Sequence, residues 1–142
     1  MSEFELHAQL ERDCSVVGDL PLCRVLLMND NHYPWLILVP RRAGLRELYE
    51  LEEPDLAAFW RESSALGRAL MQHFRGDKLN VAALGNVVPQ LHIHHIVRHH
   101  DDSAWPRPVW GAVPAQPYAE AEREQRLSEL RALLAASGGA PA

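Results

Sequence analysis

The sequence predicts an α+β fold in which an antiparallel sheet of about five strands carries one long helix and a C-terminal helix. Two apolar runs, 22–28 and 35–39, flank the turn-forming stretch 29–34 and so predict an antiparallel hairpin. Residues 54–74 place apolar side chains at helical spacing. The apolar residues within 88–100, which are Leu91, Ile93, Ile96 and Val97, make this stretch typical of a buried strand.

The composition limits the class of protein. The chain has 142 residues, of which 47% are hydrophobic and 23% charged, as in a soluble globular protein with a proper core. A net charge of -5 argues against a general nucleic-acid-binding surface, although a local site can still bind a nucleotide. No apolar run spans a bilayer, and the N-terminus is acidic where a signal peptide is basic, so we expect a cytoplasmic protein without membrane attachment.

The other elements follow in chain order. We expect a short helix in 4–14, a strand in 15–19, a helical piece in 43–51, a strand in 79–84 and an amphipathic helix in 117–136. Phe59 and Trp60 are expected to be core anchors of the long helix. Cys14 and Cys23 lack the spacing of a zinc or disulfide framework, so we expect two reduced cysteines. We divide the chain into a domain at 1–111 and a C-terminal extension at 112–142, which ends in a flexible tail.

The stretch 88–100 holds five of the eight histidines. Side chains alternate along a strand, which places Gln90, His92 and His94 on one face and Leu91, Ile93 and His95 on the other. Two imidazoles and an amide on one face of a rigid element indicate a site. His95 falls among the apolar positions, where we expect a buried histidine with satisfied hydrogen bonds. His99 and His100 are expected to lie in solvent beyond the strand.

These residues resemble the motif of the histidine triad (HIT) family, His-φ-His-φ-His-φ-φ, where φ is apolar. The best register runs from Gln90 to Ile96, with Gln90 at the first histidine and His95 at an apolar position as the two departures. A register beginning at His92 fits less well, because it puts Ile96 at the third histidine. The resemblance covers roughly residues 4–105 and implies a HIT-like fold.

The resemblance also implies a reaction. His92 would attack the α-phosphorus of a nucleotide to form a nucleotidyl-histidine, and His94 would stabilise charge on the phosphoryl group and help protonate the leaving group. Gln90 would take the first position, where its amide can hydrogen-bond but cannot titrate. We therefore expect a hydrolase or transferase that acts on a phosphoramidate, an adenylate or a dinucleoside polyphosphate, without a metal or cofactor.

Nucleotide contacts follow from the same resemblance. Asn29, and second Asp30, stand where the family contacts the ribose, although both residues also suit a plain turn. Gly85 and Asn86 stand in the loop that passes the phosphates in the family, although Gly-Asn also suits a hairpin. The segment with Trp105 and Trp110 resembles the C-terminal tail of the Hint branch, which favours a homodimer. Alternatively, these tryptophans cover the chain's own sheet.

Two other function classes stay open. His-x-His on a strand also binds metals in β-barrels of the cupin type, but that class has many short strands and no long helix such as 54–74. The chain could instead be a binding protein that keeps the nucleotide pocket with little catalysis. Gln90 and His95 are the features that favour this reading.

Overall fold

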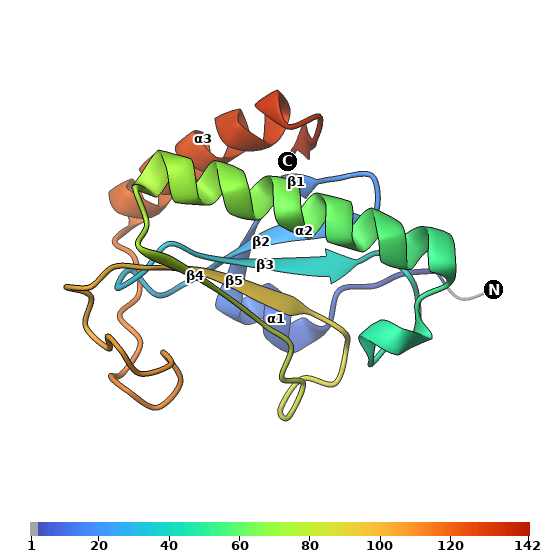
Figure 1. Ribbon diagram of the computed structural model, residues 1–142, viewed down its shortest axis with the longest axis horizontal. Coiled ribbons are helices and arrows are strands. Elements are labelled where there is room, and N and C mark those ends of the chain that lie inside the picture. The colour runs from blue at the N-terminus through green and yellow to red at the C-terminus, as the bar shows by residue number, and fades with distance from the viewer. Residues whose placement is uncertain (1–2) are drawn as a thin grey trace.

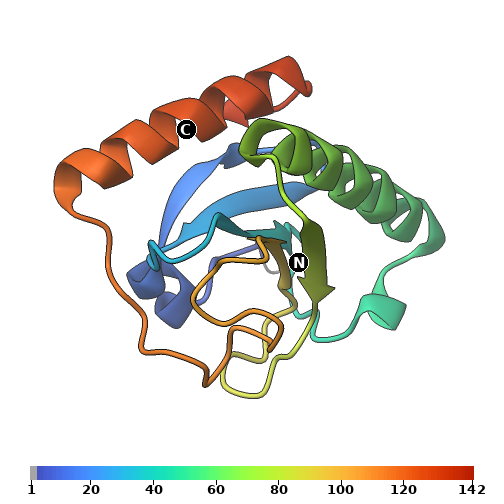
Figure 2. The ribbon, with the colours of Figure 1, turned by 60° about the vertical axis from the view of Figure 1, so that its left-hand side comes forward.

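An antiparallel sheet forms the centre of the molecule, with helices on both of its faces (Figure 1). The structure, a computed structural model, describes residues 3–142. Two helices, α2 and α3, cover one face, and the short helix α1 lies against the other face together with the segment that follows the sheet (Figure 2). Buried apolar side chains fill both sides of the sheet, so the fold has a core on each side.

In chain order, the described residues form six strands, three α-helices and one 3-10 turn. They are α1 (Ala8–Asp13), β1 (Cys14–Asp19), β2 (Cys23–Met28), β3 (Trp35–Pro40), η1 (Leu48–Glu50), α2 (Glu53–Phe74), β4 (Lys78–Ala82), β5 (Ile93–Arg98), α3 (Glu120–Ala136) and β6 (Ala140–Pro141). The sheet order is β4-β5-β3-β2-β1-β6. The predicted α+β class, the hairpin of β2 and β3, and the long helix are thereby confirmed.

The sheet has six strands rather than five, because the C-terminal tail adds one. We expected 137–142 to be flexible, but β6 pairs with β1, and the amide of Ala142 donates to the carbonyl of Val17 at 2.9 Å. Gly18 makes this approach possible, since a Cβ there would collide with Ala140 and Leu134. A tail of small residues carries no strand pattern, so only the partner strand reveals it.

Helix α3 belongs to the same packed body as the sheet. Its buried residues Leu127, Leu130 and Leu134 join the core cluster that also contains Phe59 of α2. The helix of the extension that we assigned to 112–142 therefore covers the core over β1. No helix within residues 3–142 is long and apolar enough to cross a membrane.

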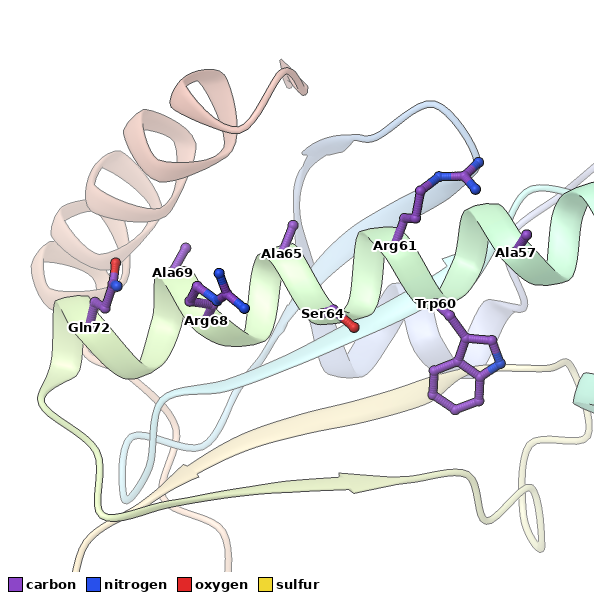
Figure 3. A pocket seen from close by; sticks show the side chains of 8 residues that line it. All are labelled: Ala57, Trp60, Arg61, Ser64, Ala65, Arg68, Ala69 and Gln72. Carbon is purple, nitrogen blue, oxygen red and sulfur yellow. The ribbon is translucent and has the colours of Figure 1, made fainter.

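Helix α2 buries one side and exposes the other. Phe59, Leu66 and Leu70 point into the core. Trp60, which we expected to be a second core anchor, is instead 48% exposed and lines a shallow groove on the outer face of the helix (Figure 3). The prediction for Trp60 was wrong because residue 60 lies about 100° around the helix from Phe59, on the side that faces solvent.

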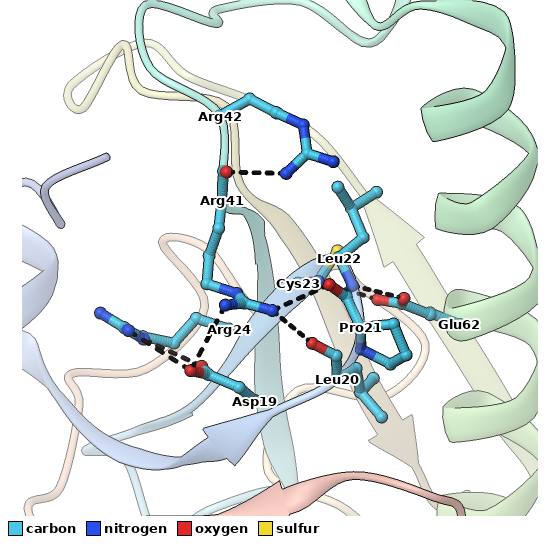
Figure 4. A network of polar contacts seen from close by, with 9 residues as sticks. All are labelled: Asp19, Leu20, Pro21, Leu22, Cys23, Arg24, Arg41, Arg42 and Glu62. Carbon is cyan, nitrogen blue, oxygen red and sulfur yellow. Dashed lines mark hydrogen bonds and ion pairs between the residues drawn. The ribbon is translucent and has the colours of Figure 1, made fainter. Parts of the chain in front are cut away.

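A buried carboxylate joins α2 to the turn between β1 and β2. Glu62 accepts hydrogen bonds from the backbone amides of Leu22 at 2.8 Å and Cys23 at 2.9 Å (Figure 4). From the other side of the turn, the guanidinium of Arg41 donates to the carbonyls of Leu20 and Pro21. Backbone groups that have no partner in the sheet are thus satisfied by two charged side chains.

We expect Glu62→Ala to lower the free energy of unfolding by about 3 kcal/mol, since two amides lose their acceptor in a buried position. Urea unfolding would measure this loss. Glu53→Ala, at an exposed position in the first turn of the same helix, is the matched control and should change stability by less than about 1 kcal/mol. Equal losses in the two variants would show that the buried bonds contribute little.

Candidate functional site

The motif enters the sheet at Ile93, where β5 begins, so residues 88–92 form an extended segment that leads into the strand. The predicted alternation holds within the strand. His94 lies opposite Ile37 and shares a cavity with it on the α1 face, whereas His95 contacts Ser63 of α2 on the other face. Because β5 lies between β4 and β3, the neighbouring strands hold the second half of the motif, from residue 93 on, in place.

His92 has one ring nitrogen engaged and one available. Its Nδ1 lies 2.6 Å from the backbone oxygen of Gln90. A carbonyl only accepts hydrogen bonds, so Nδ1 carries the proton and Nε2 carries the lone pair. The residue is 7% exposed and lines the cavity. This arrangement is the one that a histidine nucleophile needs.

His94 lies beside His92, with 5.0 Å between the ring centroids. Its Nδ1 accepts a hydrogen bond from Nε1 of Trp35 at 2.9 Å, and the ring of Trp110 packs edge-on against it at 5.0 Å. Burial, together with the neighbouring His92 and His95, lowers the pKa of His94 to about 3. His94 is therefore a neutral ring at physiological pH.

The side chain of Gln90 is engaged with the N-terminal segment. Its Oε1 accepts from the amide of His7, and its Nε2 donates to the carbonyl of Glu5, both at 2.8 Å. The segment 5–7 leads directly into α1, which forms one wall of the cavity. Gln90 thus contacts His92 through its backbone oxygen, whereas its side-chain amide holds the segment that leads into α1.

A cavity of about 440 Å³ opens in front of the two histidines. Leu10, Met28, Ile37 and Val88 make most of its lining apolar. Its polar lining includes Gln9 and Asp13, which come from α1. An apolar cavity with a few polar groups suits an organic ring that carries a charged group toward the histidines.

The loop before the motif also lines this cavity. Gly85 and Asn86, which we predicted to contact a nucleotide, both border it, and so does Val87. Gly85 has a φ of 72°, in the region that favours glycine, so the turn itself explains this residue. Both readings of Gly85 from the sequence are therefore compatible with its place.

Asn29 and Asp30 lie at the end of β2, but neither borders the cavity. Asn29 accepts from the amide of Tyr118 at 2.9 Å. Asp30 is 4% exposed and accepts from the ring and amide of His32. Both side chains thus hold turns and the segment before α3, and their role in nucleotide binding stays a prediction.

The remaining histidines of the cluster lie where the pattern placed them, with one exception. His95 is fully buried, as expected, and its Nε2 lies 2.7 Å from Oγ of Ser63. His100 is exposed beyond the strand. His99 is only half-buried, because its Nε2 donates to the carbonyl of Phe74 at the end of α2. Within residues 3–142, no three His, Cys, Asp or Glu side chains gather to hold a metal ion.

Comparison with known proteins assigns the family. A family model described as the HIT domain matches residues 9–101. The chain belongs to the histidine triad family. No curated protein matches the sequence at a significant level.

Three solved histidine triad proteins are similar to the chain over nearly its whole length. The protein from Marinobacter aquaeolei is 52% identical, covers 95% of this chain and 98% of its own, and superposes with a TM-score of 0.92. The one from Bradyrhizobium japonicum is 46% identical, with coverages of 92% and 98% and a TM-score of 0.89. The one from Sinorhizobium meliloti is 42% identical, with coverages of 92% and 97% and a TM-score of 0.88. Because each alignment covers more than nine-tenths of this chain, the similarity extends beyond residues 9–101.

Several site residues of this histidine triad protein were not predicted from the sequence. Trp35 of β3 contacts His94, and Gln9 and Asp13 of α1 line the cavity. The one signal for Trp35 was strand alternation, which puts it on the same face as Ile37, opposite His94. Trp110 packs on His94 of β5, in line with the alternative that the tryptophans of this segment cover the chain's own sheet. At the family level, membership supports chemistry of a nucleotide hydrolase or transferase.

Proposed function

We propose that the chain hydrolyses or transfers a nucleotide phosphate through a covalent nucleotidyl intermediate on Nε2 of His92. The observation that carries this proposal is the 2.6 Å contact from Nδ1 of His92 to the carbonyl of Gln90. It holds the ring in one tautomer with the other nitrogen free for the cavity. A lone pair held on a rigid backbone segment is prepared for attack without reorganisation.

The reaction has two steps. In the first, Nε2 of His92 forms a bond to the α-phosphorus as the bond to the leaving group breaks, and solvent supplies the proton that the leaving group takes up. In the second, an oxygen of water or of another acceptor bonds to phosphorus as the N–P bond breaks. The proton of the acceptor passes to solvent, the nucleotide is released and the neutral ring of His92 is restored. His94 lies close enough to hydrogen-bond the phosphoryl oxygens in both steps.

The cavity supports a nucleotide as the ligand. Its volume of about 440 Å³ and apolar lining suit a base and sugar, and the backbone amides of the loop at Gly85 and Asn86 suit phosphate oxygens. Asn29 and Asp30 would contact the ribose only after releasing their present partners. A substrate of the phosphoramidate, adenylate or dinucleoside polyphosphate type therefore stays our expectation.

Intact mass spectrometry after brief mixing with an adenosine phosphoramidate tests this proposal. The expected result is a mass increase of one AMP moiety on the wild type and release of AMP with time. If AMP raises the melting temperature but no adduct and no turnover appear, the protein is a binding module and the proposal fails. Binding of stoichiometric zinc at the motif would instead support the metal alternative.

We further propose that the protein is a homodimer in which two copies bury the outer face of α2. The groove there is lined by small residues, Ala57, Ala65 and Ala69, beside the exposed ring of Trp60 (Figure 3). Small side chains let a second helix approach closely, and an exposed tryptophan is typical of an interface. Strand β4, which contacts α2, is an edge strand of the sheet.

We expect Trp60→Glu to convert the dimer into a monomer, because two charges would be buried in a two-fold interface. Light scattering during size-exclusion chromatography measures the mass. Tyr49→Glu is the control, since Tyr49 is 82% exposed and lies outside the groove. A monomeric wild type, or a Trp60→Glu variant that stays dimeric, would contradict this interface.

A further inference from the structure

Trp35 is the first residue of β3 and reaches across to the neighbouring strand. It pairs with Ile96 in the ladder, so its side chain is diagonal to His94, two residues earlier on β5. The ring is 5% exposed and belongs to the core cluster on the α1 face. The indole N–H donates to Nδ1 of His94 at 2.9 Å. A buried indole with its N–H aimed at an active-site ring is more than a packing residue.

The chemistry of this hydrogen bond has one consequence for His94. An indole nitrogen only donates, so the ring nitrogen that faces it must be the unprotonated one. In a neutral imidazole the proton then sits on Nε2. His94 is neutral in the fold, because burial lowers its pKa to about 3. The protein thus determines which nitrogen of His94 carries the proton.

The two site histidines are therefore held in opposite tautomers. The carbonyl of Gln90 places the proton of His92 on Nδ1, and the indole of Trp35 places the proton of His94 on Nε2. One ring offers a lone pair at Nε2, and the other offers a donor at Nε2. A lone pair attacks phosphorus, and a donor stabilises the oxygens that gain charge during the attack.

We propose that Trp35 is a positioning residue that keeps His94 in the Nε2–H tautomer, so that His94 donates to the phosphoryl oxygens of the bound nucleotide. This inference rests on the proposed function and deepens it. Without the indole N–H, the two tautomers of His94 would interconvert, and a ring with its lone pair at Nε2 would repel the same oxygens. Trp110 packs edge-on against both Trp35 and His94, which limits rotation of the pair.

The test replaces Trp35 in two ways. Trp35→Phe removes the N–H and part of the ring, and benzothienylalanine at position 35 keeps the bicyclic shape and removes only the N–H. Nitrogen-15 NMR of the imidazole rings reports the tautomer of His94 without substrate. Steady-state kinetics with an adenosine phosphoramidate report kcat and KM. Trp105→Phe is the control, because Trp105 packs on Arg98 and His100 and lies outside the cavity.

In the wild type we expect an unprotonated Nδ1 and a protonated Nε2 on His94. Both changes at position 35 should mix the tautomers and lower kcat about tenfold, the factor that corresponds to one net hydrogen bond, with KM changed less than about twofold. Trp105→Phe should change neither. A wild-type proton on Nδ1 would overturn the inference, and so would a benzothienylalanine protein with the wild-type tautomer or kcat. If no protein turns over, the proposed function fails, while the tautomers still decide the role of Trp35.

Discussion

His92→Ala is expected to lower kcat for AMP release from an adenosine phosphoramidate by at least about 10³-fold, because the variant lacks the atom that bonds to phosphorus. Water would have to attack directly, without the ring that Gln90 holds in the reactive tautomer. The nucleotidyl adduct should be absent from the mass spectrum of the variant. His92→Gly should behave in the same way, and added imidazole should restore part of its activity by occupying the vacated space.

The fold should survive this change. The imidazole of His92 borders a cavity on one side, so its loss removes little core packing, and the melting temperature should fall by only a few degrees. His100→Ala is the matched control, since His100 is an exposed histidine eight residues further along the chain. A variant at position 92 that keeps its adduct or its turnover would show that another residue is the nucleophile.

Acid should unfold the protein through its buried histidines. Burial lowers the pKa of His94 to about 3 and that of His95 to about 4, although the hydrogen bond from His95 to Ile93 acts in the opposite direction. In the unfolded chain both histidines have the ordinary pKa of 6.5. Between about pH 6.5 and pH 4 the unfolded chain therefore binds more protons than the native state, so the free energy of unfolding falls as the pH falls. Each histidine contributes up to about 3 kcal/mol to this loss.

Urea unfolding at pH 7, 6, 5 and 4 measures the effect, and a double variant isolates the part due to His95. Ser63→Ala with His95→Leu removes the titrating ring and the hydroxyl that bonds to it, so Oγ of Ser63 is not left buried without its partner. Carboxylates titrate similarly in both proteins, so the difference in slope belongs to His95. We expect the double variant to lose about 3 kcal/mol less than the wild type between pH 7 and pH 4. Parallel curves for the two proteins would contradict this account.

Local patterns in the sequence predicted most of the secondary structure. The hairpin of β2 and β3 followed from two apolar runs around a turn, and the helix predicted at 54–74 was observed at Glu53–Phe74. Strand alternation separated His94 from His95 correctly, because a strand has only two faces. The motif from Gln90 to Ile96 was enough to identify the family, which the HIT domain match over residues 9–101 confirmed.

Alternation along a strand and periodicity along a helix predict which way a side chain points, but not which residues it contacts. Gln90 was placed on the site face by its motif position, yet its amide binds residues 5 and 7, more than 80 positions away in the chain. Asn29 was a polar residue at a strand end, and its partner proved to be the backbone at Tyr118. Neither partner has a local signal, because each depends on the path of the chain through space.

The sequence by itself determined the α+β class, the family, and the strand that carries His94, with His92 directly before it. Those features depend on apolar periodicity and on the spacing of a few residues, which act over a short distance in the chain. Only the tertiary structure decided the tautomers of the two histidines, the wall that α1 supplies to the cavity, and the pairing of the tail with β1. These depend on which strands become neighbours, since a hydrogen bond from Trp35 to His94 exists only when β3 and β5 lie side by side.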